Sequence, residues 1–405
     1  MIEYAEARSL VLAAARALPA ESVPLAAALG RTLARDISAR EPVPPFTKAT
    51  MDGYAVRAAD TRPSGSGPDG AVTLEVLEDL PAGRRSRRTV GPGQAVRIMT
   101  GAPLPAGADA VVMVEDSEKR DGRVALRRAV RPGDNIGEAG EDLAKGERAL
   151  ARGTVVGPAE IAVLAATGRA RVPVARRPKV AVIATGDEIV EPGARKKPGQ
   201  IRNANGPALA AMAAAAGAEA AYLGIARDRA SSLRAKLARA RGADVLVLSG
   251  GVSVGDYDLV KDELEAFGVE TVFWRVRIKP GKPVFFGRRG RQLVFGLPGN
   301  PTSAMVTFLL FVGPALDGLL GRAATGPRAG RAALAADIVL KPGRLQFLRG
   351  VLEGDGPALR VSPYNDQRSG VLRSMVHGRV LIVVPADAAR LEAGREVDIL
   401  YMDGR

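Results

Sequence analysis

The sequence of 405 residues contains no cysteine and only one histidine, His377. The absence of cysteine excludes disulfides, thiolate nucleophiles and zinc sites built on sulfur, and one histidine cannot supply a set of imidazole ligands. Any bound metal is therefore expected to be a hard ion held by oxygen atoms. Aromatic residues make up only 4% of the chain, which leaves few platforms on which single-stranded nucleic acid could stack.

Long hydrophobic runs are also missing. The longest, such as Ala210–Gly217 and Met305–Val312, are too short or too interrupted by Gly and Pro for a hydrocarbon layer, which needs about 20 residues. The N-terminus carries Glu3 and Glu6 and lacks the basic start and cleavage site of a signal peptide. The sequence thus predicts a cytoplasmic protein that makes no use of a membrane.

Positive charge is plentiful. Lys and Arg outnumber Asp and Glu by 58 to 44, for a net charge of +14, which favours an anionic partner, although a general bias toward arginine would give the same excess. The cations are scattered, and no nucleic-acid-binding motif is present. We therefore expect no nucleic acid partner, and strong salt-sensitive binding to arbitrary DNA would contradict this.

Length and pattern predict a multidomain protein, because single cores rarely exceed roughly 250 residues. The expected class is α/β plus all-β, with a central, mostly parallel three-layer α/β domain between β-rich N-terminal and C-terminal domains. The predicted parts are an N-terminal helix (1–25), an extended linker domain (26–45 and 143–174), a β-rich domain (46–142), the α/β domain (175–326) and a C-terminal β-barrel-like domain (327–405).

Local signals place these boundaries. Successive prolines before Phe46 prevent a helix, and from Pro178 strands alternate with helices, one of which we expect Ser231 to cap. We also expect glycines at helix ends, a last helix that starts at Pro301 and runs toward Leu320, and a linker at Arg322–Gly330. The expected C-terminal glycines are Gly217, Gly242 and Gly268.

A glycine-rich loop, SGGVSVGDYD, follows the buried strand DVLVL. Ligands bind beyond the carboxyl ends of strands in open parallel sheets, and glycines let backbone N–H groups approach an anion. This favours a phosphate site over a bare turn. The expected substrate-binding residues of this loop are Ser249, Gly250, Gly251, Ser253 and Gly255.

A second loop, ATGDE, follows the strand KVAVI and should open on the same edge with Thr185, Gly186 and Glu188. Asp228 and Asp258 follow two further strands. Each acid alone is more typical of a solvated loop, but three carboxylates beside a phosphate indicate a Mg²⁺ site.

Cations gather in WRVRIKPGKP, where strand alternation would place Arg275, Arg277 and Lys279 on one face, facing either solvent or an anion. The turn LPGNPTS begins a helix whose N-terminal amides could also face an anion. Its expected binding residues are Pro298, Asn300, Pro301 and Ser303.

Taken together, MDGYAVR (Met51–Arg57), TGAPLPAGADAVVMVE (Thr100–Glu115), ATGDE, SGGVSVGDYD, IKPGKP and LPGNPTSA resemble the MoeA family, which is related to the C-terminal part of gephyrin. The resemblance runs in order along the whole chain. It implies a homodimer with four domains per chain and molybdopterin molybdenumtransferase activity in molybdenum cofactor biosynthesis. The active site would be shared between the α/β domain of one chain and the MDGYA-bearing domain of the other.

The resemblance also implies residue roles. Asp52 and Thr100 would reach in from the partner chain, while Glu188, Asp228 and Asp258 would serve Mg²⁺ and the adenylyl phosphate. The anions molybdate and phosphate would be held by Lys279, Lys282, Arg349 and Ser369. Arg275 stands where the family pattern often has lysine, which keeps the charge but changes its geometry.

The reaction so implied is Mg²⁺-assisted insertion of molybdate into adenylylated molybdopterin with release of AMP. Molybdate is a tetrahedral oxyanion that calls for cations and N–H donors, so the missing cysteines are no obstacle if the pterin dithiolene supplies sulfur. Two alternatives stay open: an adenylyltransferase acting on molybdopterin with ATP, for which the β-rich first third is unnecessary, and a scaffold protein. The sequence does not separate molybdate from tungstate.

Overall fold

The computed structural model describes residues 1–62, 71–251, 259–323 and 325–402. It contains two compact units. The first comprises Met1–Arg35, Arg152–Gly157 and Pro173–Arg405, and the second comprises Asp36–Ala151 and Pro158–Val172.

The second unit is built on a sheet of short strands, as the alternation of apolar runs and turns predicts. Its strand order is β7-β4-β6-β5-β9-β8. Both faces of the sheet are buried, because Tyr54 and Val56 point to one core and Ala55 to the other. The strand bounds are β4 (Gly53–Val56), β5 (Val72–Leu80), β6 (Gln94–Ile98), β7 (Ala110–Met113), β8 (Ser117–Arg120) and β9 (Arg123–Leu126).

Smaller elements complete this unit. Two short antiparallel pairs join β3 (Lys48–Ala49) to β10 (Ile136–Gly137) and β2 (Ile37–Ser38) to β11 (Arg148–Leu150). One helix, α2 (Pro158–Ala166), follows them.

The central sheet of the first unit has the order β16-β13-β17-β21-β20-β18. Neighbours from β16 to β21 are parallel, whereas β20 runs antiparallel to both β21 and β18. The expected mostly parallel sheet is thus confirmed. Its strands are β13 (Lys179–Thr185), β16 (Glu219–Ala226), β17 (Val245–Ser249), β18 (Glu270–Trp274), β20 (Phe285–Arg289) and β21 (Gln292–Leu297).

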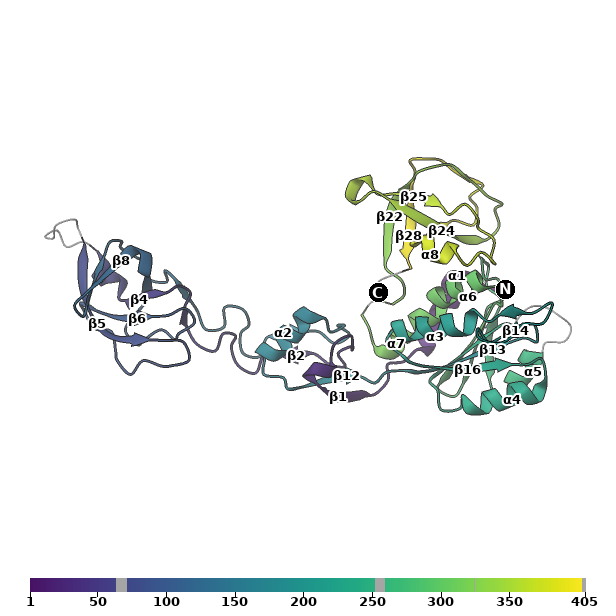
Figure 1. Cartoon of the computed structure of the whole chain (residues 1–405), viewed down its shortest axis with the longest axis horizontal. Helices are drawn as coiled ribbons and strands as arrows, with labels where there is room; N and C mark the ends of the chain where they lie inside the picture. The colour runs from purple at the N-terminus through teal and green to yellow at the C-terminus, as the bar shows by residue number, and fades with distance from the viewer. Residues whose placement is uncertain (63–70, 252–258, 324, 403–405) are drawn as a thin grey trace. The chain divides into compact units, whose positions relative to one another are not determined.

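Helices cover both faces of this sheet, which confirms the three layers. On one face α1 (Tyr4–Ala14), α3 (Asn205–Ala215) and the helix at Pro301–Leu320 share a core with Val180 and Val182. On the other face α4 (Ala230–Arg239) and α5 (Leu259–Ala266) pack on Ala181 and Ile183. Figure 1 shows α3 and α7 on one side of β13 and β16, with α4 and α5 on the other.

The helix expected to run from Pro301 toward Leu320 is confirmed, and it continues through Gly313 and Pro314. It consists of α6 (Pro301–Thr307), a π-helical turn (Phe308–Val312) and α7 (Gly313–Leu320). The wider π turn lies just before Pro314, which has no N–H to donate. By length and composition alone this helix could cross a membrane, but 89% of its most apolar 18-residue window is buried in the fold, as in the core helix of a soluble protein.

The C-terminal part closes into a small barrel, because β24 pairs with both β25 and β26 at the ends of the series β24-β25-β22-β28-β26. The expected β-barrel-like fold is therefore confirmed. Its strands are β22 (Ala329–Leu334), β24 (Leu345–Glu353), β25 (Arg360–Pro363), β26 (Val380–Val384) and β28 (Glu396–Tyr401).

Several local expectations are wrong. The helix expected over 1–25 ends at Ala14, and Ala20–Pro24 is a strand, β1. Ser231 lies inside α4, whose N-cap position is Arg229. The linker expected at Arg322–Gly330 overlaps the start of β22, whose Ala- and Gly-rich sequence hides its pairing with β28.

Candidate functional site

The carboxyl edge of the central sheet surrounds a cavity of about 470 Å³, which we call the acidic cavity because Glu188 and Asp228 line it. It lies where β13, β17 and β21 end at Thr185, Ser249 and Leu297. Most of the binding residues expected in the α/β domain are brought together here. They are Thr185, Gly186, Glu188, Asp228, Ser249, Gly250, Gly251, Pro298, Asn300 and Pro301.

The glycine loop at this edge requires glycine for steric reasons. Gly250 has a φ of +95°, and a Cβ there would lie 2.7 Å from the carbonyl oxygen of Thr185. Any side chain would therefore force the β13 and β17 loops apart. Ser253, Gly255 and Asp258, also expected in this loop, lie outside the described residues.

A buried asparagine ties three of the loops together. Asn205, the first residue of α3, donates hydrogen bonds to Ser249 Oγ (2.8 Å) and to the carbonyl oxygen of Gly299 (2.7 Å). The ends of β17 and β21 and the start of α3 are thereby fixed against one another. Sequence reasoning missed this residue, although the run RNANG before an apolar helix carries the signal.

The acid-bearing loop is held by Arg227. Its Nη1 donates to three carbonyl oxygens, those of Gly186 (3.3 Å), Asp187 (3.2 Å) and Ile189 (2.9 Å). These carbonyls flank Glu188 on both sides, so the guanidinium fixes the backbone that presents this carboxylate. Arg227 was also missed, because its sequence position gives no sign of this clamp.

Asp187 and Asp228 link the ends of β13 and β16. The N–H of Asp187 donates to Asp228 Oδ2 (3.2 Å), and the N–H of Asp228 donates to Asp187 Oδ1 (3.4 Å). The acidic cavity thus offers two carboxylates, Glu188 and Asp228, which fits Mg²⁺ because this ion uses one or two protein carboxylates plus substrate phosphates. Within the described ranges, no group of three or more His, Asp or Glu side chains could hold a metal.

A second network stabilises the neighbouring wall. Asn203 Nδ2 donates to the Tyr222 oxygen (2.6 Å), and the Tyr222 hydroxyl donates to Glu191 Oε1 (2.9 Å). Burial and the Glu191 carboxylate raise the pKa of the Tyr222 hydroxyl, so it stays a donor at neutral pH. This network joins β16, the start of α3 and the segment after β14 (Ile189–Val190).

The expected cations line a different cavity, of about 630 Å³, which we call the basic cavity. Lys279, Lys282, Ser303, Arg349 and Ser369 line it, together with Arg344 and Arg368, which sequence reasoning missed. The structure therefore does not bring Lys279 and Glu188 into one cavity. The two cavities are neighbours, because Pro283 lines both.

Arg349 is the most buried cation of the basic cavity, with 1% of its surface exposed. Its guanidinium donates to Ser374 Oγ (3.1 Å) and to the carbonyl oxygens of Asp366 (3.3 Å) and Arg368 (3.2 Å). Burial lowers the pKa of this guanidinium, and the Asp366 carboxylate only partly opposes the shift. That carboxylate is engaged by Arg368 (2.9 and 3.0 Å). A buried charge held by neutral acceptors is suited to an incoming anion.

The arrangement expected for Arg275, Arg277 and Lys279 is wrong in part. β18 ends at Trp274, Arg275 has a φ of +71°, and only Ile278–Lys279 forms a further strand, β19. Arg277 pairs with Glu3 (3.0 Å), and only Lys279 of the three lines the basic cavity. A left-handed residue interrupts the alternation of side chains that a regular strand would impose.

Asp52 and Thr100 lie together in the second unit. The N–H and Oγ1 of Thr100 both donate to Asp52 Oδ1, each at 2.7 Å. These hydrogen bonds, the backbone one first, lower the pKa of the Asp52 carboxyl. Both residues are exposed.

Three family models match the chain in order. They describe the MoeA N-terminal region (domain I and II) over residues 2–168, a probable molybdopterin binding domain over 181–318, and the MoeA C-terminal region (domain IV) over 331–402. Together they span most of the sequence and include the residues that line both the acidic and the basic cavity.

Named relatives and a solved structure agree with these models. Molybdopterin molybdenumtransferase 2 of Mycobacterium tuberculosis is 39% identical over 386 residues, 93% of this chain and 94% of the relative. Molybdopterin molybdenumtransferase of Bacillus subtilis is 37% identical over 387 residues, 94% and 90% of the two chains. The structure of a molybdopterin biosynthesis MoeA protein from Pyrococcus horikosii superposes with a TM-score of 0.86 at 36% identity and covers 100% of both chains. The chain therefore belongs to the MoeA family and is an enzyme of molybdenum cofactor biosynthesis.

Proposed function

We propose that the enzyme inserts molybdate into adenylylated molybdopterin, with Mg²⁺ as cofactor and AMP as the released product. The observation that carries this proposal is the pairing of two neighbouring cavities joined at Pro283: one is lined by carboxylates and a glycine loop, and the other by cations with no carboxylate among its described lining residues. The first suits a phosphoanhydride with its metal, and the second suits a tetrahedral oxyanion.

In the acidic cavity, Glu188 and Asp228 would hold the metal. Mg²⁺ would supply positive charge that neutralises the phosphates as AMP departs. Gly250 and Gly251 let the start of the glycine loop pack closely against Thr185 and Val260, and Asn205 holds Ser249 in place at that point. Arg227 positions the acid loop but does not itself line the cavity.

In the basic cavity, Lys279, Lys282 and Arg349 would bind molybdate, with Ser303 and Ser369 as hydroxyl donors. No carboxylate lines this cavity in the described part of the chain, so nothing there repels an oxyanion. Lys279 is exposed and Arg349 is buried. Molybdate would thus first meet the solvated Lys279 and then bind the fixed guanidinium of Arg349.

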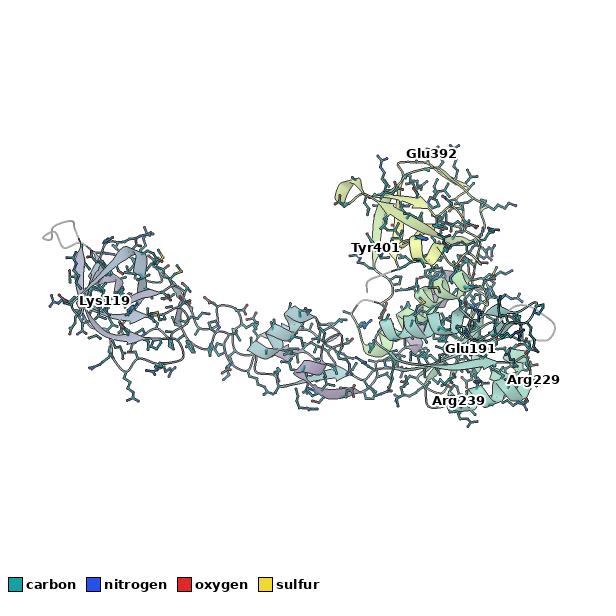
Figure 2. The ribbon with its side chains drawn as sticks, in the orientation of Figure 1. Lys119, Glu191, Arg229, Arg239, Glu392 and Tyr401 are labelled. Carbon is teal, nitrogen blue, oxygen red and sulfur yellow. The ribbon has the colours of Figure 1, made fainter. Side chains whose placement is uncertain are left out.

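The decisive assay incubates the full chain with adenylylated molybdopterin, Mg²⁺ and molybdate and follows AMP. We expect molybdate-dependent release, reduced at least tenfold by Glu188→Gln or Asp228→Asn. Glu392→Gln removes an exposed carboxylate of the C-terminal part, labelled in Figure 2, and serves as the matched control. Absence of molybdate-dependent AMP release by the folded wild-type protein would reject the proposal. No AMP-forming activity is expected from ATP and molybdopterin that lacks the adenylyl group.

We further propose a cytoplasmic homodimer in which Asp52 and Thr100 complete the active site of the partner chain. The support is the family resemblance together with the exposed, hydrogen-bonded pair that these residues form. Asp52→Ala and Glu188→Ala are each expected to be inactive. Mixing them after reversible dissociation should restore about a quarter of the wild-type activity, because half of the dimers regain one intact site. No recovery in a mixture shown to contain heterodimers would contradict a shared site.

A further inference from the structure

A third cavity, of about 560 Å³, lies at the amino end of the central sheet, opposite the edge that carries the acidic cavity. Arg176 and Asp244, which precede β13 and β17, line it together with Leu293 of β21. The C-terminal ends of α1 and α7 contribute Ala13 and Leu319. Its volume is in the range of cavities that hold small ligands.

Arginine dominates its lining, so we call it the arginine cavity: Arg16, Arg176, Arg288 and Arg291 line it. Asp244 is the one acidic residue among the described lining residues. The bare lining therefore carries an excess of three positive charges.

The single carboxylate is already engaged by other groups. Arg176 donates to both oxygens of Asp244 (2.8 and 3.0 Å), and the N–H of Lys179 donates to Oδ2 (2.7 Å). Asp244 is thus paired with Arg176 and accepts a hydrogen bond from the first residue of β13. Among the described residues, it forms no ion pair with the other three arginines of the cavity.

Those three arginines have no counter-ion among the residues that the structure describes. In the described ranges, Arg16, Arg288 and Arg291 form no ion pair and no side-chain hydrogen bond. Arg289, between two of them, shows the contrast: its Nε donates to the carbonyl of Phe267 and its guanidinium lies 4.4 Å from that ring. Three exposed cations that line one cavity raise its positive potential, and an anion bound between them would lower their mutual repulsion.

We propose that the arginine cavity binds a small polyphosphate, a ligand with two or more linked phosphate groups. Guanidinium groups bind phosphate oxygens in pairs of parallel hydrogen bonds, and a cavity of about 560 Å³ has room for more than one linked phosphate group. No aromatic side chain is among the described residues that line the cavity, so the recognition is directed at the phosphate chain and not at a base. This site is separate from the acidic and basic cavities and does not depend on the proposed function.

The test is isothermal titration of the full-length protein with inorganic tripolyphosphate in Mg²⁺-free buffer at two salt concentrations. Arg288→Ala/Arg291→Ala should weaken binding at least tenfold, and Arg288→Lys/Arg291→Lys should recover part of it. Both arginines are exposed, so the variants should keep the wild-type circular dichroism spectrum. The matched control is Arg229→Ala/Arg239→Ala, which removes the same charge at the two ends of α4 (Figure 2) and should bind as the wild type does.

Each outcome decides the matter. A tenfold loss confined to the Arg288/Arg291 variant, with binding retained by Lys279→Ala/Lys282→Ala, supports the site. Equal losses in the α4 control, no loss at all, or loss only in the Lys279/Lys282 variant would overturn it. Tighter binding of an acidic peptide than of tripolyphosphate would also overturn it, in favour of a protein partner. Titrations with ADP and with pyrophosphate, which both carry two linked phosphate groups, show whether a nucleotide or an inorganic ligand binds more tightly.

Discussion

Replacement of Arg349 by methionine should separate the stability of the C-terminal barrel from its capacity to bind an anion. The change removes three hydrogen bonds to neutral acceptors, at a cost of about 3 kcal/mol in total. It also removes a buried charge without a direct carboxylate partner, whose desolvation costs the wild type on the order of a few kcal/mol. The two effects oppose each other, so the net change in the free energy of unfolding should stay within about 2 kcal/mol.

The loss of anion binding in Arg349→Met is not offset by a second effect. Molybdate at a hundred times its Kd should stabilise the wild type by about 2.7 kcal/mol, and Arg349→Met should lose most of this gain. Urea unfolding of both proteins, with and without molybdate at matched ionic strength, measures both quantities. An equal molybdate-induced gain in Arg349→Met would refute the assignment of Arg349 to the oxyanion. A loss of stability far above 2 kcal/mol in the absence of molybdate would instead make Arg349 a purely structural residue.

Three further predictions follow from individual contacts. Arg227→Ala frees three carbonyls around Glu188. It should therefore raise the dissociation constant for Mn²⁺, used as a spectroscopic substitute for Mg²⁺, at least fivefold, with little change in the thermal midpoint of unfolding. An unchanged Mn²⁺ affinity would contradict the clamp. The hydrogen bonds from Arg368 hold the pKa of Asp366 at about 2, below its ordinary value. The stability that this carboxylate contributes should therefore be complete above about pH 4 and be lost as the pH falls toward 2. An NMR titration of the Asp366 carboxyl with a midpoint near 4 would show that these hydrogen bonds do not hold the carboxylate. Gly53→Ala would place a Cβ 1.9 Å from the carbonyl oxygen of Val112 on the paired strand. The free energy of unfolding of the second unit should therefore fall by about 3 kcal/mol or more. A urea midpoint equal to that of the wild type would exclude so close an approach.

The sequence predicts the fold class because its signals are local. Strands such as VLVLS and KVAVIAT are continuous apolar runs followed by glycine, and this pattern survives without knowledge of the tertiary structure. It also locates the carboxyl edge, since parallel strands end on the same side. The prediction fails at β22, where alanine and glycine give no apolar contrast and only pairing with β28 creates the strand.

The candidate site was predictable only where a residue's role depends on its own loop. Thr185 and Ser249 end their strands and Gly250 follows one directly, so the strand pattern alone locates them. Asn205 and Arg227 act on carbonyls and hydroxyls of other loops, so their partners become neighbours only after folding. Arg275 shows the opposite error, because the strand rule predicts a face that its positive φ removes.

The buried helix Pro301–Leu320 has a mechanical consequence. Twenty residues at about 1.5 Å each make a rod about 30 Å long, with Pro301 at the wall of the acidic cavity and Leu319 at the wall of the arginine cavity. Close packing along nearly its whole length leaves little freedom to bend, so a small axial displacement at one end would be carried to the other. The two ends of the sheet are therefore joined by one continuous buried helix, so a displacement of Pro301 along the helix axis would also move Leu319.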